Sequence, residues 1–182
     1  MKQTFVNILR GLTLFIILLA GVGGYMLYEK TLSAWWIPVG MALTIAGITF
    51  PFYKKWVWLT TCDNKTANLL CHLLCVGTLS YALFLIGNYC LADPSSTQEE
   101  EVVVQRKFQK THRKTRRVGR GRYVADGVRK EYYLQVTFKN GMKKDVHVSL
   151  SVYNKTRTGG TRTLTLQRGF FGLPVITKGL GI

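Results

Sequence analysis

The sequence predicts an integral membrane protein, in which three transmembrane α-helices are followed by a small C-terminal antiparallel β domain, either a sheet or a partly open barrel. The first half contains three long stretches without charge, and the second half alternates apolar and polar residues between turn signals. Residues 1–92 hold six Lys and Arg against two acids, whereas residues 93–182 hold nineteen against seven. We therefore expect a transmembrane domain over 1–92, a linker over 93–101 and a basic β-rich extramembrane domain over 102–182.

The three apolar stretches, over about 11–28, 34–53 and 69–92, are each long enough to cross a bilayer as a helix. The first has eighteen residues, which at 1.5 Å per residue extend about 27 Å, close to the thickness of the hydrocarbon layer. Soluble helices of this length carry a polar stripe, and these stretches do not. The sequence therefore favours three membrane spans over a soluble helical core.

Residues typical of the lipid–water boundary flank the second stretch. Trp35 and Trp36 lie at its start, and the connection that follows it places Trp56 and Trp58 beside Lys54 and Lys55. Aromatic and basic side chains are enriched at that boundary. We expect the connection over 54–67 to lie in the headgroup layer.

The first stretch also fits a cleavable signal peptide, because Lys2 and Arg10 precede it and small residues end it. Its apolar run is longer than that of a typical signal peptide, and no Ala-x-Ala cleavage site follows. A retained anchor is the favoured interpretation.

Basic residues near the membrane ends predict the orientation. Five of them lie on the side of the N-terminus, whereas the first loop offers only Lys30 and the tail begins with acids. This places the N-terminus in the cytoplasm and the C-terminal domain outside it, in what we expect to be a bacterial inner membrane. The basic run that follows in the tail favours the opposite orientation, but long domains translocate largely regardless of charge. The five residues are Lys2, Arg10, Lys54, Lys55 and Lys65.

The tail reads as four or five strands without a helix. Asn140-Gly141 is a strong hairpin signal between the strands predicted over 130–138 and 144–150, because a type I′ turn needs positive φ at both central residues. Gly159-Gly160 marks a second turn before the strand predicted over 161–167. We expect the apolar end, 169–176, to pack back onto the sheet.

A run of cations in the tail is the most prominent candidate site. Nine Lys and Arg within seventeen residues attract phosphate groups, of which anionic lipid headgroups are favoured because the run begins a few residues beyond the membrane. Tyr123, Tyr132 and Tyr133 offer rings for stacking nucleic-acid bases, although they fit equally well as sheet residues. The alternative interpretation is a solvated, strongly charged strand pair or loop without a specific ligand. The cations are Arg106, Lys107, Lys110, Arg113, Lys114, Arg116, Arg117, Arg120 and Arg122.

Cys71, His72 and Cys75 form a Cys-His-x-x-Cys pattern within the third apolar stretch. Two thiols four residues apart share one helix face, but a metal site normally needs a third or fourth suitable ligand. We therefore interpret the group as core thiols and a packing imidazole, and expect neither a metal nor a cofactor. His72 is still the one titratable side chain within a span apart from the thiols and tyrosines, which marks it for mutation.

No enzyme signature is present, so we expect a protein without catalytic activity. The first hypothesis is an accessory or assembly protein whose basic domain binds a partner protein or an anionic membrane surface, with homo-oligomers a further option. The second is a membrane effector whose basic domain binds a phosphorylated ligand, such as a nucleotide, and rearranges a helix bundle. A channel or transporter subunit is the third hypothesis and ranks below the other two, because the spans lack the charges that usually mark a permeation path.

Overall fold

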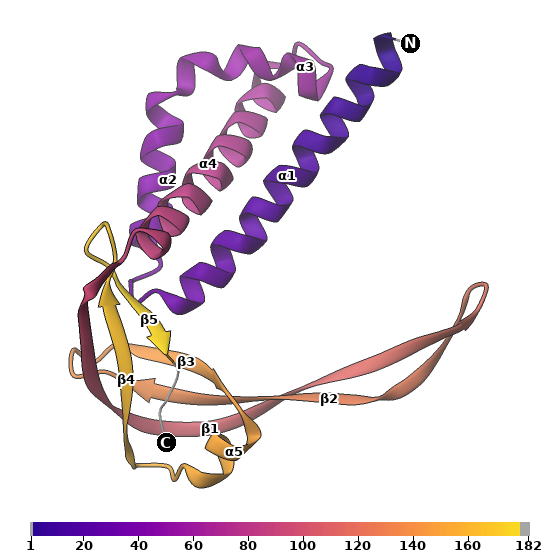
Figure 1. Ribbon diagram of the computed structural model, residues 1–182. Helices are drawn as coiled ribbons and strands as arrows, with labels where there is room; N and C mark the ends of the chain where they lie inside the picture. The colour runs from indigo at the N-terminus through magenta and orange to yellow at the C-terminus, as the bar shows by residue number, and fades with distance from the viewer. Residues whose placement is uncertain (1, 179–182) are drawn as a thin grey trace. The chain divides into compact units, whose positions relative to one another are not determined.

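The computed structural model describes residues 2–178 of the chain, so the last four residues of the predicted β domain lie outside the described residues. The chain folds into two compact units. The helical unit comprises the residues up to Ser95 together with Arg168–Val175, and the sheet unit comprises Ser96–Gln167 with the residues that follow Val175. Figure 1 shows the elements of both units.

Two helices of the helical unit are long and apolar enough to cross a membrane. They are α1 (Lys2–Lys30) and α4 (Lys65–Cys90), which replace the predicted stretches 11–28 and 69–92 with longer helices. Helix α4 begins where Asn64 accepts hydrogen bonds from the backbone N–H groups of Thr66 and Ala67, an N-cap that satisfies two otherwise free donors.

The second predicted span differs from the structure. Instead of one helix over 34–53, helix α2 (Trp36–Ile48) is followed by the 3₁₀-helix η1 (Phe50–Trp56) and the short helix α3 (Val57–Thr60). The chain bends by 76° at this break. Pro51 explains the early end of α2, because proline lacks the N–H that continues a helix and its ring clashes with the preceding turn. Thr49 also donates its hydroxyl to the Ile45 carbonyl.

Small residues bring α1 and α4 close together. A Cβ atom on Gly21 would lie 3.2 Å from a Thr78 methyl group, and one on Gly24 would lie 3.2 Å from the Cα atom of Ala82. Close backbone approach is the usual role of glycine between membrane helices. Gly23, Gly40 and Gly47 have open space at the same position, so only two of the five glycines serve this contact.

The sheet is antiparallel, with the strand order β3-β2-β1-β4-β5. Alternate residues are fully buried in the core, among them Val102, Val104, Leu134, Val136 and Leu164. This alternation is the one that the sequence predicts. The strands are β1 (Asp93–Gly119), β2 (Arg122–Thr137), β3 (Lys143–Val148), β4 (Thr161–Arg168) and β5 (Pro174–Lys178).

The Asn140-Gly141 hairpin is confirmed, but its turn is of another kind. Gly141 has φ +78°, whereas Asn140 does not have positive φ, and the Gly141 N–H donates to the Phe138 carbonyl. This is a three-residue connection with a left-handed glycine rather than a type I′ turn. The second predicted turn is also present, with Gly159 at φ +81°.

A short helix interrupts the predicted all-β domain. Helix α5 (Leu150–Lys155) follows β3, and Ser149 caps it by accepting a hydrogen bond from the Val152 N–H. A serine three residues before the bonded donor is a standard helix start. The expectation of a tail without a helix is therefore wrong.

The segment 93–101, predicted as a linker, is the first part of β1. Its polar, proline-containing composition favours a loop, but β4 lies beside β1 in the sheet, and Gln167 donates a hydrogen bond to Thr97. Pairing with a strand far away in sequence overrides a local preference, since strand propensity depends on context.

The apolar segment predicted to pack onto the sheet, 169–176, divides in two: residues 174–176 join the sheet in β5, whereas 169–173 pack against helix α4. Asn88, which is fully buried, donates from Nδ2 to the Leu173 carbonyl at 3.0 Å and accepts at Oδ1 from the Phe171 N–H at 3.1 Å. The ring of Phe171 stacks on Phe84 with centroids 4.6 Å apart. Residues 169–173 are therefore part of the helical unit.

Candidate functional site: a basic two-stranded arm

The outer part of the β1–β2 hairpin carries most of the predicted cations. We define the arm as residues 111–130, every one of which is exposed. It ends in a two-residue turn, Arg120-Gly121, between the paired residues Gly119 and Arg122. In Figure 1 this ribbon extends away from the other strands of the sheet. The arm is therefore a two-stranded ribbon that no other element of its unit covers.

Cations of the arm lie opposite uncharged residues of the neighbouring strand. Arg113 pairs with Val128, Arg116 with Val124 and Arg117 with Tyr123. Paired residues share one face of a sheet and consecutive residues alternate between faces. Arg116 and Arg117 thus point to opposite faces, and each has an apolar or aromatic neighbour along which its alkyl stem can lie.

Pairing also adds two cations that sequence reasoning missed. Arg129 and Lys130 on β2 lie opposite His112 and Thr111. With them the arm holds eight Lys and Arg and one acid, Asp126, a net charge of +7. The Gly-Arg-Gly sequence at the tip could have revealed these two cations. It indicates a tight turn, which pairs the residues before it with those after it.

Three of the predicted cations lie outside the arm. Lys107 donates its ammonium to the Thr156 carbonyl at 2.7 Å and lies 4.5 Å from the ring centre of Tyr153. Lys110 lies 4.6 Å from the ring centre of Tyr133. Both amines contact their own domain, whereas Arg106 is exposed near the core of the sheet. We therefore assign the candidate site to the arm and leave these three out of it.

The tyrosines of the hairpin divide in the same way. Tyr132 packs against Tyr153 with centroids 5.0 Å apart, and Tyr133 stacks on Phe108 with centroids 5.4 Å apart. Tyr123, on the arm, is 66% exposed. Two of the three rings are therefore sheet residues, and only Tyr123 is open to a partner.

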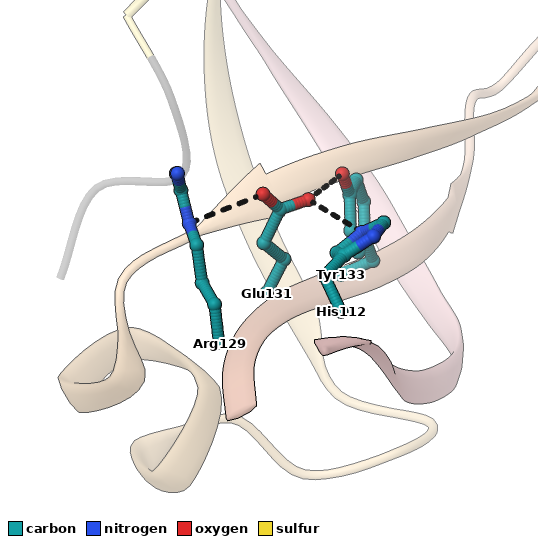
Figure 2. Close-up of polar contacts among 4 residues, drawn as sticks. All are labelled: His112, Arg129, Glu131 and Tyr133. Atoms are coloured by element: carbon teal, nitrogen blue, oxygen red, sulfur yellow. Dashed lines mark hydrogen bonds and ion pairs between the residues drawn. The ribbon is translucent and has the colours of Figure 1, made fainter. Parts of the chain in front are cut away.

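A small polar cluster lies where the arm joins the sheet (Figure 2). Glu131 accepts a hydrogen bond from the Tyr133 hydroxyl at 3.0 Å and forms ion pairs with His112 at 3.6 Å and Arg129 at 3.4 Å. The Tyr133 hydrogen bond is the main reason that the pKa of Glu131 lies below its usual value of 4.5, and the neighbouring His112 and Arg129 act in the same direction. This carboxylate links Arg129 of β2 and His112 of β1 at the base of the arm.

Replacing Tyr133 by phenylalanine is expected to raise the pKa of Glu131, because the hydroxyl donates a stronger hydrogen bond to the charged carboxylate than to the neutral acid. A group with a depressed pKa contributes stability above its unfolded pKa and loses it as the pH falls through the folded pKa. The wild type should therefore lose this contribution below about pH 4.5, and the variant should lose less. A carboxyl-carbon NMR titration measures the shift. Tyr132→Phe is the control, and an unchanged Glu131 pKa in Tyr133→Phe would contradict the assignment.

The Cys-His-x-x-Cys residues have separate partners. The sulfur atoms of Cys71 and Cys75 lie 3.8 Å apart. His72 is 1% exposed and accepts a hydrogen bond at Nδ1 from the Trp56 indole, at 2.9 Å, while Nε2 lies 3.1 Å from the Ala46 carbonyl. Because a carbonyl only accepts, Nε2 carries the proton and the ring is neutral. Over residues 2–178 no three His, Cys, Asp or Glu side chains are grouped as a metal site.

His72 therefore fastens the bend after α2 to helix α4. Replacing it by leucine is expected to lower the free energy of unfolding by about 2 kcal/mol, because the Trp56 N–H loses its buried acceptor. Glutamine, which offers both a donor and an acceptor, should restore part of the loss. Thermal unfolding in detergent measures both, and an increase in the unfolding temperature of the wild type on adding zinc would contradict the structural role.

Comparison with protein-family models, with curated proteins and with solved structures finds no match for this chain. The candidate site therefore rests on its own geometry and charge.

Proposed function

We propose that the chain is an integral membrane accessory protein that crosses the bilayer three times and binds an anionic membrane surface through the arm. Two helices have the length and apolarity for this, and a third crossing is supported by their direction. The Leu32 N–H after α1 donates to Pro174, and Asn88 near the end of α4 donates to Leu173. Helices whose C-terminal ends meet the same short segment run in the same direction, which favours a return of the residues between them across the membrane.

The bent pair of helices supplies this return. Helix α2 has 13 residues, about 20 Å of helix, which is less than the hydrocarbon thickness. We assign the remaining distance across the membrane to η1 and α3. Their exposed Phe52 and Trp58 are typical of the lipid–water boundary. With the N-terminus in the cytoplasm, three crossings place the sheet unit outside. A reporter enzyme fused to the C-terminus tests this orientation, and activity restricted to the cytoplasm would overturn it.

One observation carries the lipid assignment: the arm combines a net charge of +7 with exposed apolar side chains on the same ribbon. Binding at the headgroup layer scales with buried apolar area together with attraction to anionic lipids. Cations on both faces favour an extended anionic surface over a phosphorylated small molecule, which needs cations that converge on one point. The apolar residues are Val118, Tyr123, Val124 and Val128, between 55% and 66% exposed.

The arm also has little support of its own. An isolated two-stranded hairpin is marginally stable in water, and the like charges of the arm repel one another. An anionic surface removes this repulsion and covers the apolar residues. We infer that the arm is most ordered when it is bound.

Vesicle capture tests the proposal with the full chain. The protein is held in nanodiscs of phosphatidylcholine, and capture of vesicles that contain phosphatidylglycerol is compared with capture of pure phosphatidylcholine vesicles. We expect capture of the anionic vesicles alone, and a steep loss with added salt. Equal capture of both vesicles would overturn the lipid assignment, as would displacement by single-stranded nucleic acid at concentrations that leave other basic membrane proteins bound.

A further inference from the structure

A cavity of about 300 Å³ lies at the bend between α2 and η1, within the helical unit. Aromatic and aliphatic side chains form its walls, namely Phe52, Trp56, Trp58 and Val76. Lys55 and His72 also line it. A small concave site with apolar walls and few polar groups is the usual form of a ligand pocket.

The polar groups inside the cavity already have partners. The Trp56 indole donates to His72, and the other ring nitrogen of His72 lies against the Ala46 carbonyl. The indole of Trp56 and the imidazole of His72 therefore offer no free hydrogen-bond donor or acceptor to a ligand. The interior of the cavity therefore suits a hydrocarbon group, and specificity must come from its rim.

One cation, Lys55, lines the cavity, and a second, Arg10, is bonded to the backbone of Trp58 in its wall. Lys55 places its ammonium 5.0 Å from the ring centre of Phe52. Arg10 donates from Nε to the carbonyl of Trp58 at 2.5 Å and from Nη1 to the Asn7 side chain at 3.1 Å, which orients its guanidinium beside the cavity wall. Among the described residues, neither Arg10 nor Lys55 forms an ion pair with an acid. Within residues 2–178, the positive charge in the cavity lining and the one bonded to its wall thus have no negative partner.

We propose that this cavity binds one anionic phospholipid, with the phosphate between Arg10 and Lys55 and the upper part of an acyl chain against Phe52, Trp56 and Trp58. Guanidinium groups bind phosphate oxygens through paired hydrogen bonds, and lysine adds a point charge. The inferred cytoplasmic leaflet is the anionic one. This site rests on the membrane crossing proposed above and is independent of the arm.

Native mass spectrometry of the full chain tests the site. Arg113, Arg116, Arg117 and Arg122 are first replaced by glutamine, so that the arm contributes little lipid binding. Phosphatidylglycerol and phosphatidylcholine with identical acyl chains are then titrated into the detergent-solubilised protein. We expect one phosphatidylglycerol to bind with higher affinity than phosphatidylcholine, and the double variant Arg10→Gln/Lys55→Gln to weaken it about thirty-fold.

The matched control is Lys54→Gln/Lys65→Gln, which removes the same charge on the same side of the unit from residues that do not line the cavity. An equal loss in the control pair would show unspecific attraction and overturn the site, and so would equal affinity for the two lipids. Trp58→Ala should weaken both lipids together, since it removes a wall and no charge. Because four of the arm's eight cations are already removed, failure here leaves the arm proposal untouched.

Discussion

Replacing Asn88 by leucine is expected to lower the free energy of unfolding of the helical unit by about 3 kcal/mol, the largest stability effect that we predict for one substitution. Asn88 is fully buried and bonds through its side chain to the Phe171 N–H and the Leu173 carbonyl. Leucine has a similar volume but cannot accept from the Phe171 N–H, and a buried group left without a partner costs about 1–3 kcal/mol. The Leu173 carbonyl loses one donor and keeps the hydrogen bond from the Gly169 N–H.

Gly169 provides a second test of the same contact. A Cβ atom at this position would overlap the side chain of Asn88. Gly169→Ala should therefore destabilise the wild type by about 1–3 kcal/mol, the usual cost of overpacking, but much less in the background of Asn88→Ala. Gly77→Ala is the control because a Cβ atom there meets open space. Strictly additive effects of Gly169→Ala and Asn88→Ala, measured by thermal unfolding in nanodiscs, would contradict the contact.

Replacing Arg113, Arg116, Arg117 and Arg122 by glutamine is expected to weaken binding of anionic vesicles about a thousand-fold. Each basic residue near an anionic surface contributes about 1 kcal/mol, so four contribute about 4 kcal/mol. All four are exposed on the arm, and two of them face Val124 and Val128 across the ribbon. The vesicle-capture assay with nanodiscs of phosphatidylcholine measures the change.

A control variant distinguishes the effect of where the charges lie from the effect of the total charge of the protein. Lys139, Lys143, Lys155 and Arg157 are exposed on the sheet unit outside the arm, and their replacement by glutamine removes the same four charges. We expect this variant to retain most of the binding, with a loss of less than about ten-fold from long-range attraction. An equal loss in the two variants would mean that net charge rather than the arm determines binding.

The sequence predicts the helices and the sheet where the pattern is long and regular. The uncharged stretches became α1 and α4, and the alternation of Leu134 and Val136 places both in the core. The break after α2 was harder to predict, because Pro51 near the end of an apolar stretch is compatible with a straight span that ends there. The structure shows that the helix ends earlier, at Ile48.

Features that depend on residues far apart in the sequence cannot be predicted from local sequence patterns. The segment 93–101 has a loop-like composition and becomes a strand because β4 lies beside it. Asn88 resembles any polar residue near a helix end, and its partners lie more than eighty positions away. Within the candidate site, the run of cations was evident, but the addition of Arg129 and the separation of Lys107 from the site follow only from strand pairing and contacts.

Amide hydrogen exchange of the arm tests the central claim most directly, because it reports on residues 111–130 of the unmodified full chain in either orientation. Exchange is measured in nanodiscs of pure phosphatidylcholine and in nanodiscs that contain phosphatidylglycerol. We predict slower exchange over 111–130 in the anionic discs, reversed by high salt, with little change in the buried strand residues around Leu134. Exchange over the arm that is equally fast in both kinds of disc would contradict the claim that it binds an anionic membrane surface.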